Sequence, residues 1–408
     1  MPEEIVELRG HLIDSLILPK VMDAVRAHHG SFEILRFDVG NRPADPSFAR
    51  IRVAHEDEEK LDLLLQHISR YGADPVERRE VEWKRAPKDG VFPEDFCATT
   101  NLDTWIYLRG RWRKVKDPEM DSGILLLHGG KSARTIKMAE VKKGDPIVVG
   151  RAGVRALAVE RYRPADEFEF MTSEISMEKP KGLLIRALAR QMRLERHHGR
   201  PILWVCGPAI VHSGAGGLFE KLIQKSFVQI LFAGNALAVH DVEAALMGTS
   251  LGVSMREGAV TRGGHENHLR AINAIRAAGG IRKAVRSGLL RSGIMHACVK
   301  HGVDVVLAGS IRDDGPLPEV ITDTLSAQAA MRRRCSRGQG VELAVMVATL
   351  LHSVATGNML PARTKVFCVD MQQANVTKLM DRGTFQSTGI VTDVQPFLHE
   401  LLGELGIR

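Results

Sequence analysis

The chain has 408 residues, of which 44% are hydrophobic and 26% are charged, and its formal net charge is +7. This composition excludes a disordered or fibrous chain and is typical of a globular protein of two or three domains. Aromatic residues make up only 5% and the basic residues are scattered, so we do not expect nucleic-acid binding. The excess basic charge either lies on a solvated surface or attracts phosphates and small acids.

Targeting signals and covalent cross-links are not predicted. The five cysteines lack CxxC pairing, which argues against a disulfide framework and a zinc site. No apolar stretch reaches membrane-spanning length, and the first residues do not resemble a signal peptide. We therefore expect a cytoplasmic protein that does not contact a membrane.

Residues 1–90 alternate between strand and helix patterns. The strand patterns cover 4–10, 32–37 and 48–53, and the helical patterns cover 16–29 and 56–71. This βαββα order predicts a ferredoxin-like α+β domain. Such a domain either binds a ligand or, more commonly, mediates association.

Residues 91–176 are predicted to form a small β subdomain. A charged stretch over 75–92 precedes it and is either a linker or an edge strand. Short strand patterns separated by turns then follow, over 104–108, 111–115, 123–127 and 146–149. Before these strands, Thr99-Thr-Asn101 is either turn chemistry or a set of donors that face a substrate.

Residues 177–408 repeat one local pattern, in which a short apolar run ends in a polar or glycine-rich turn. The runs are 202–206, 229–232, 304–307, 343–348, 365–369 and 389–392. Helical patterns lie before and between them, over 177–198, 217–226, 241–247, 266–278, 281–289, 318–333 and 373–382. Apolar runs without alternation suit strands buried on both faces, so we predict a Rossmann-like, doubly wound parallel sheet.

Ligands of such sheets bind beyond the carboxyl ends of the strands, which makes the polar residues there candidates for a site. Asp370 closes an apolar run, where a carboxylate can accept both hydroxyls of an adenosine ribose. The alternative is a turn or helix-cap aspartate. Because a carboxylate repels a 2′-phosphate, NAD is favoured over NADP. The run Gly214-Ala-Gly-Gly217 either cradles a diphosphate or is a simple tight turn.

Other polar residues after strands suggest substrate chemistry. Arg312, Asp313 and Asp314 share a turn that could order a carboxylate base or grip an amino-acid substrate. Asn235 and Ala236, in the predicted loop after the second strand, could contact a nicotinamide or its ribose.

Four titratable residues lie near predicted strand ends or in loops: His240, Asp241, His265 and His268. The last two are three residues apart, which could suggest a metal. No third ligand is evident, so we do not expect a metal site.

Several longer motifs span nearly the whole chain: Arg9–Asp14, Thr99–Asn101, Ala233–Asp241, Gly248–Gly252, Ala308–Pro318, Gly357–Pro361 and Gly389–Val394. In them the chain resembles archaeal and bacterial ornithine cyclodeaminases that carry the lysine-ketoglutarate reductase/saccharopine dehydrogenase (LOR/SDH) conserved domain. It also resembles the C-terminal module of bifunctional arginine dihydrolase/ornithine cyclodeaminases. The sequence departs from the family at Phe96-Cys97-Ala98 and at Met371-Gln-Gln373.

The resemblance implies tightly bound NAD and conversion of L-ornithine to L-proline and ammonia, as part of proline biosynthesis from ornithine and arginine. The hydride is taken up and later returned, so the reaction is redox-neutral. The NAD contacts carried over are Asn235, Ala236, Asp314, Thr349, Leu350, Leu351, His352, Asp370, Asp393 and Val394.

We also expect a homo-oligomer, with Asp313 or Asp314 as the catalytic base and Arg312 as the anchor of the substrate carboxylate. The alternatives are a net amino-acid dehydrogenase, a lysine cyclodeaminase, and a non-catalytic NAD-binding regulatory protein.

Overall fold

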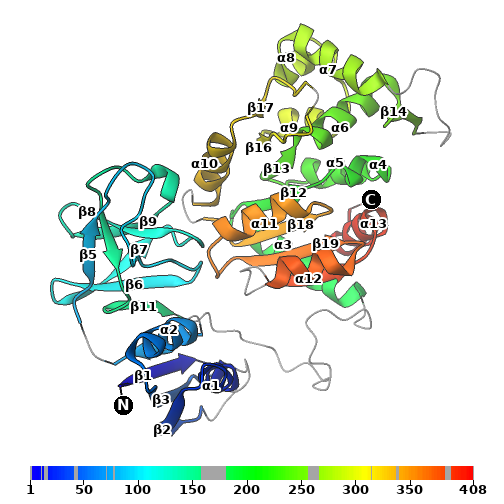
Figure 1. Cartoon of the computed structure of the whole chain (residues 1–408). Coiled ribbons are helices and arrows are strands. Elements are labelled where there is room, and N and C mark those ends of the chain that lie inside the picture. Colours follow the sequence, from blue (N-terminus) through cyan, green and yellow to red (C-terminus); the bar gives the residue numbers. More distant parts are fainter. Residues whose placement is uncertain are drawn as a thin grey trace. The chain divides into compact units, whose positions relative to one another are not determined.

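The computed structural model describes residues 2–10, 12, 17–40, 45–69, 71–76, 79–157, 181–255, 266–313, 315–336, 340–381 and 387–407. The chain divides into two compact units, residues 1–172 with 361–363, and residues 173–360 with 364–408 (Figure 1). Antiparallel pairing dominates the first unit and a parallel sheet forms the second, which confirms the predicted α/β class. The division into three domains stays a prediction, and its boundary at residue 176 lies outside the described residues, as do His265 and Asp314.

The first unit begins with a four-stranded antiparallel sheet in the order β2-β3-β1-β4. Its elements are β1 (Glu3–Gly10), α1 (Ile17–Ala27), β2 (Ser31–Asp38), β3 (Ser47–Ala54), α2 (Glu58–Ser69) and β4 (Asp74–Pro75). Alternate residues such as Leu8 and Ile51 are buried in one core with Val25 and Leu64 of the helices. This is the predicted ferredoxin-like arrangement, completed by the short strand β4.

A seven-stranded sheet follows, in the order β11-β6-β7-β9-β8-β10-β5. The strands are β5 (Glu82–Arg85), β6 (Asp103–Leu108), β7 (Arg111–Lys116), β8 (Gly123–Leu127), β9 (Ser132–Ile136), β10 (Pro146–Val149) and β11 (Val154–Leu157), with the 3₁₀ turn η1 (Met138–Glu140) after β9. Part of the charged stretch 75–92 therefore forms an edge strand, β5, which pairs with β10.

The second unit contains the parallel sheet β17-β16-β13-β12-β18-β19-β20. Its strands are β12 (Ile202–Cys206), β13 (Ile230–Gly234), β16 (Asp304–Ala308), β17 (Val320–Ile321), β18 (Leu343–Val347), β19 (Lys365–Asp370) and β20 (Ser387–Val391). Apart from the two-residue edge strand β17, the third, second, first, fourth, fifth and sixth strands lie side by side in that order. This is the Rossmann order, and the chain reverses direction across the sheet between β12 and β18.

Helices cover both faces of this sheet, as the apolar runs predict. They are α3 (Lys181–His197), α4 (Ala209–His212), α5 (Gly216–Gln224), α6 (Asn235–Met247), α7 (Asn267–Ala278), α8 (Ile281–Arg286), α9 (Ile294–His301), α10 (Thr324–Cys335), α11 (Leu350–Met359), α12 (Gln373–Asp381) and α13 (Val394–Leu405). Trp204 of β12 packs in a core with α5 and α13, whereas its neighbour Leu203 packs in a second core with α10, α11 and α12. None of the described helices is long and apolar enough to cross a membrane.

Three predictions about local structure in this unit were wrong. The stretch 318–333 was predicted as one helix, but it forms β17, a break at 322–323, and α10, because Asp323 caps a new helix through Ser326 N. The pattern at 241–247 is the second half of α6, which starts at Asn235. Helices α9 and α11 were not predicted; they have only 8 and 10 residues, which is too short for a clear apolar period.

Candidate functional site

The carboxyl ends of the parallel strands lie along one edge of the sheet, and two of them meet closely where the strand order reverses. Gly207, directly after β12, donates its N–H to Val347 O of β18 at 2.9 Å. A Cβ atom at this position would lie 1.9 Å from Ala348 O. Ala348 itself has a φ of 50°, in the left-handed region that non-glycine residues seldom occupy. The reversal point is therefore a tight, strained turn, as is common at ligand sites.

Two helices begin directly at this edge, and both expose N–H groups. Asn235 and Ala236 are the first residues of α6, not a loop as predicted, and Leu350 to His352 form the first turn of α11 after Thr349. Neither helix has a side-chain cap at its start. Free N–H groups at a helix start bind anions such as phosphates, so six of the expected cofactor contacts occupy a suitable place.

Asp370 ends β19 and is 9% exposed. Its Oδ1 atom accepts hydrogen bonds from Gln372 N at 2.8 Å and from Asn375 Nδ2 at 3.3 Å. No donor in the described part of the chain hydrogen-bonds to Oδ2. The carboxylate thus stabilises the turn through Oδ1 and leaves Oδ2 for a ligand hydroxyl. The two interpretations of Asp370, as a turn aspartate and as a ribose-binding carboxylate, are therefore compatible.

His352 connects α11 to the ends of two further strands. A Cβ atom at Gly234, the last residue of β13, would lie 3.2 Å from the His352 ring. The imidazole also hydrogen-bonds to the backbone of Ala308, the last residue of β16. Burial lowers the pKa of His352, although the bond to Ala308 and the charge of Asp313 act in the opposite direction. The ring is therefore held neutral at the strand ends.

The turn after β16 contains Arg312 and Asp313, and it places Asp313 near this histidine. Arg312 is exposed, and its backbone N–H donates to Ser310 Oγ at 3.1 Å. Asp313 accepts from Ser310 N at 2.7 Å, which fixes its carboxylate within the turn. The roles of anchor and base stay predictions for these two residues, and Asp314 lies outside the described residues.

The remaining expected contacts are at the start of α13 and beside α6. Asp393 caps α13 by accepting from Val394 N at 2.6 Å, so its carboxylate already has a structural role. Asn235 is buried, and its Oδ1 accepts from Leu317 N at 3.1 Å, which ties α6 to the segment after β16. The glycine-rich run behaves as a turn, because Gly214 has a φ of 76° and α5 begins at Gly216.

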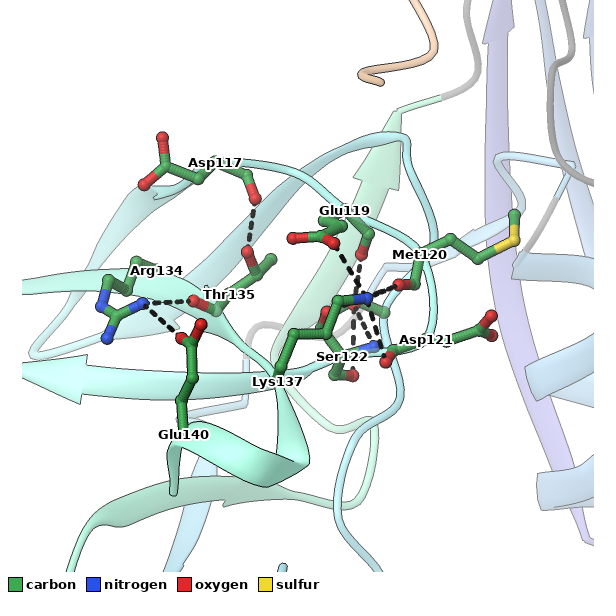
Figure 2. Close-up of polar contacts among 10 residues, drawn as sticks. Asp117, Glu119, Met120, Asp121, Ser122, Arg134, Thr135, Lys137 and Glu140 are labelled. Atoms are coloured by element: carbon green, nitrogen blue, oxygen red, sulfur yellow. Dashed lines mark hydrogen bonds and ion pairs between the residues drawn. The ribbon is translucent and has the colours of Figure 1, made fainter. Parts of the chain in front are cut away.

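In the first unit, the Thr99 motif has a structural role. The Thr99 hydroxyl donates to Glu119 O at 2.6 Å, and Ser122 N donates back to it at 3.2 Å. Figure 2 shows that Lys137 also holds this loop, because its ammonium contacts the Glu119 carboxylate at 3.0 Å and Met120 O at 2.5 Å. These bonds favour turn chemistry over substrate contact for Thr99.

Cys97, where the sequence departs from the family, packs in the apolar core of the β subdomain and is 3% exposed. Burial raises the pKa of its thiol, although the charge of Arg151 lowers it. Among the described residues, no group of three or more His, Cys, Asp or Glu side chains could hold a metal ion.

One polar cluster was missed at the level of sequence. His240 of α6 shares a hydrogen bond with Glu243, and His212 of α4 shares one with Ser250, while the two imidazole rings are 4.7 Å apart. The available signal was a His and a Glu at i and i+3, which places both on one helix face, but the predicted helix began at residue 241 and therefore did not include His240.

The Rossmann strand order, the free helix starts and the carboxylate at the end of β19 define a dinucleotide-binding type of α/β protein. Family models agree along the chain. Residues 3–102 match the LOR/SDH bifunctional enzyme conserved region, and residues 103–185 match the first region of the arginine dihydrolase ArgZ-like C-terminal part. Residues 186–401 match the Rossmann fold of that same C-terminal part.

Archaeal relatives that are 44–50% identical are named ornithine cyclodeaminase. The relative from Methanopyrus kandleri is 50% identical over 404 residues, which are 99% of this chain and 97% of that protein. The chain therefore belongs to the ornithine cyclodeaminase family that shares the ArgZ-like C-terminal region. This confirms the resemblance seen in the sequence, and with it the expectation of an enzyme.

Solved relatives show the same architecture. The apo structure of the cyanobacterial arginine dihydrolase ArgZ is 34% identical, with a TM-score of 0.86 over 99% of this chain and 58% of that one. AgrE, solved as a ternary complex with ornithine and NAD+, is 36% identical, with a TM-score of 0.54 over 99% of this chain and 57% of that one. The expected cofactor is thus the one bound by a relative.

Proposed function

We propose that this chain is an NAD-dependent ornithine cyclodeaminase that converts L-ornithine to L-proline and ammonia without net oxidation or reduction. The observation that carries the proposal is Asp370, a buried carboxylate at the end of β19 with one oxygen free for a ribose hydroxyl. Family membership and the ornithine and NAD+ bound by AgrE supply the substrate and the cofactor.

The residues present fit a dinucleotide. The starts of α6 and α11 offer uncapped N–H groups to the diphosphate, and Asp370 offers an acceptor to the ribose. Within the first turns of α11, the Ser353 hydroxyl is buried and has no partner among the described residues, so it is available to a ligand. Glycine at 207 allows the backbone to close the sheet edge tightly.

Bound NAD supplies reversible hydride transfer at the substrate α-carbon. Oxidation there gives an imine, and the δ-amine of the same molecule attacks it at high effective concentration because a short tether holds it nearby. Ammonia leaves, and the returned hydride reduces the cyclic product to proline. The chain must orient the substrate carboxylate, for which we propose Arg312, and must accept protons from the two amines.

The test is incubation of the purified protein with L-ornithine and NAD+, with proline, ammonia and NADH measured together. We expect equal amounts of proline and ammonia without accumulation of NADH. Accumulation of NADH would indicate a net dehydrogenase, and preferred turnover of L-lysine would change the substrate. Retention of NAD without any product would favour a non-catalytic protein. A homo-oligomeric state, a cytoplasmic location and a role in proline biosynthesis complete the proposal.

A further inference from the structure

Glu243 of α6 has a fully buried carboxylate that holds the imidazole of His240. His240 lies on the same face of α6 as Ala236, an expected cofactor contact. Glu243 is 0% exposed, and its Oε2 atom lies 2.9 Å from His240 Nδ1. Its other contacts are all donors, namely Thr249 Oγ1 at 2.8 Å, Gly252 N at 3.1 Å and Leu251 N at 3.3 Å. Four donors around one buried carboxylate satisfy its charge and fix its position.

The charge of Glu243 determines which ring nitrogen of His240 carries the hydrogen. Burial opposes ionisation of Glu243, but the hydrogen bonds from His240, Gly252 and Thr249 outweigh it and lower the pKa of the carboxyl. An ionised Glu243 accepts the N–H of His240 Nδ1, so the free electron pair of the neutral ring is on Nε2. No group in the described part of the chain hydrogen-bonds to that Nε2 atom, and the His240 side chain is 13% exposed.

His240 is also well placed along α6. It follows the exposed residue Ala236 by four positions, and Glu243 follows by three more, so the three lie on one face in successive turns. The Cα–Cβ bonds of a helix tilt toward its N-terminus, so the His240 side chain leaves α6 on the face that Ala236 occupies one turn earlier, while its Nδ1 atom contacts Glu243 one turn later. Ala236 is an expected contact of NAD, so the ring is about one helical turn from the expected cofactor.

A second imidazole stands beside the first. His212 Nδ1 hydrogen-bonds to Ser250 Oγ at 2.7 Å, and its ring meets the His240 ring edge to face. Burial and the neighbouring His240 lower the pKa of His212, while Glu243 acts in the opposite direction. The other described groups against this cluster, Thr249, Ser250 and Asn267, are neutral, so within the described part of the chain its titratable members are two imidazoles and one carboxylate.

We propose that His240 is the proton acceptor for the substrate amines, with Glu243 as the residue that positions it. The inference rests on the proposed cyclodeaminase function. The substrate α- and δ-amines carry protons in water, and each must lose one before it can act as a neutral amine. His240 Nε2 takes these two protons one after the other and passes each to water, and the departing ammonia and the amine of proline take up two protons in exchange, so the acceptor is regenerated. Asp313 is the rival, but its carboxylate lies in an exposed turn and already accepts from Ser310 N.

The experiment compares five variants, His240→Asn, His240→Ala, Glu243→Gln, Asp313→Asn and the control His399→Asn. His399 is exposed on α13 and undergoes the same chemical change as His240. For each variant, NAD+ binding is measured by calorimetry, and kcat and kcat/KM for proline formation are measured across acidic to neutral pH.

We expect His240→Asn to bind NAD+ like the wild type, to lose about 10²- to 10⁴-fold in kcat, and to lose the acidic limb of the pH profile. Glu243→Gln should move that limb to lower pH, because the protonated imidazole loses its anionic partner, while NAD+ binding and KM stay unchanged. His399→Asn should match the wild type. Added imidazole should partly restore the activity of His240→Ala, which a structural role would not produce.

Three results would overturn the role of His240 but leave the proposed function standing. They are an acidic limb of the pH–activity profile that persists in His240→Asn, loss of that limb in Asp313→Asn instead, and loss of NAD+ binding together with activity in His240→Asn. A wild-type protein that forms no proline would overturn the proposed function, and this inference with it.

Discussion

Replacement of Asp370 by Asn tests the cofactor site most directly. The amide keeps the Oδ1 acceptor that holds Gln372 N and Asn375 Nδ2, so the turn after β19 should survive. The change falls on Oδ2, where an acceptor with a full charge becomes an NH₂ group. A hydrogen bond to a charged group contributes about 1.5–3 kcal/mol, so NAD+ should bind about 10- to 150-fold more weakly. Discrimination against NADP should also narrow, since the charge that repels a 2′-phosphate is gone.

The assay is calorimetric titration of NAD+ and NADP+ into protein freed of cofactor. Asp323→Asn is the matched control, because Asp323 is also an aspartate that accepts from a backbone N–H, Ser326 N at 2.8 Å, but it caps α10 on the surface. The control should bind NAD+ like the wild type. If Asp370→Asn does so too, then Asp370 is only a turn residue and the placement of the ribose is wrong.

Two further predictions concern stability. Gly207→Ala places a methyl group against Ala348 O, so it should lower the free energy of unfolding by about 1–3 kcal/mol and weaken NAD+ binding. The control Gly216→Ala places its methyl group in open space and should change neither property. Denaturant unfolding measures the stability, and calorimetry measures NAD+ binding. Burial raises the pKa of Asp241 to about 7, against the effect of hydrogen bonds from Met295 N and Ile294 N. Since this folded-state pKa lies above the unfolded value of about 3.8, the stability that protonated Asp241 contributes is complete below pH 4 and is lost as the pH rises to about 7. The difference in unfolding free energy between wild type and Asp241→Asn should therefore fall by up to about 4 kcal/mol over that range, and a constant difference would contradict it.

The strands of the parallel sheet could be predicted because burial on both faces leaves a direct signal. Leu203 and Trp204 are neighbours on β12, and each is fully buried in a different core, so the run has to be apolar throughout. Asp370 could be found for the same reason, as a charge that ends such a run. The start of α6 could not be predicted from the sequence, because Asn235 is itself buried and no surface-facing polar residue marks the transition from strand to helix.

The His240 cluster needed the structure for a different reason. Its members come from α4, α6 and the residues around 250, which are separated in sequence and are brought together by packing. The sequence placed His240 near a strand end or in a loop, whereas it lies inside α6, and the sequence could not show that Glu243 is buried beneath it. Similarly, the sequence shows that Cys97 departs from the family, but only the structure shows that its thiol lies in an apolar core.

The buried polar side chains of α6 explain why that helix can organise the whole site. Asn235, Asp241 and Glu243 are each less than 9% exposed, and each accepts hydrogen bonds from a different segment. Asn235 holds Leu317 N, Asp241 holds the start of α9 through Ile294 N and Met295 N, and Glu243 holds the backbone at 251–252. Removal of one of these buried acceptors would leave its N–H partners unpaired, and each unpaired group would lower the free energy of unfolding by about 1–3 kcal/mol. The segments are therefore fixed relative to α6 and not merely packed near it. Because α6 also carries Ala236 and His240, a change at Asn235 or Asp241 should alter the geometry around the expected nicotinamide before it unfolds the domain.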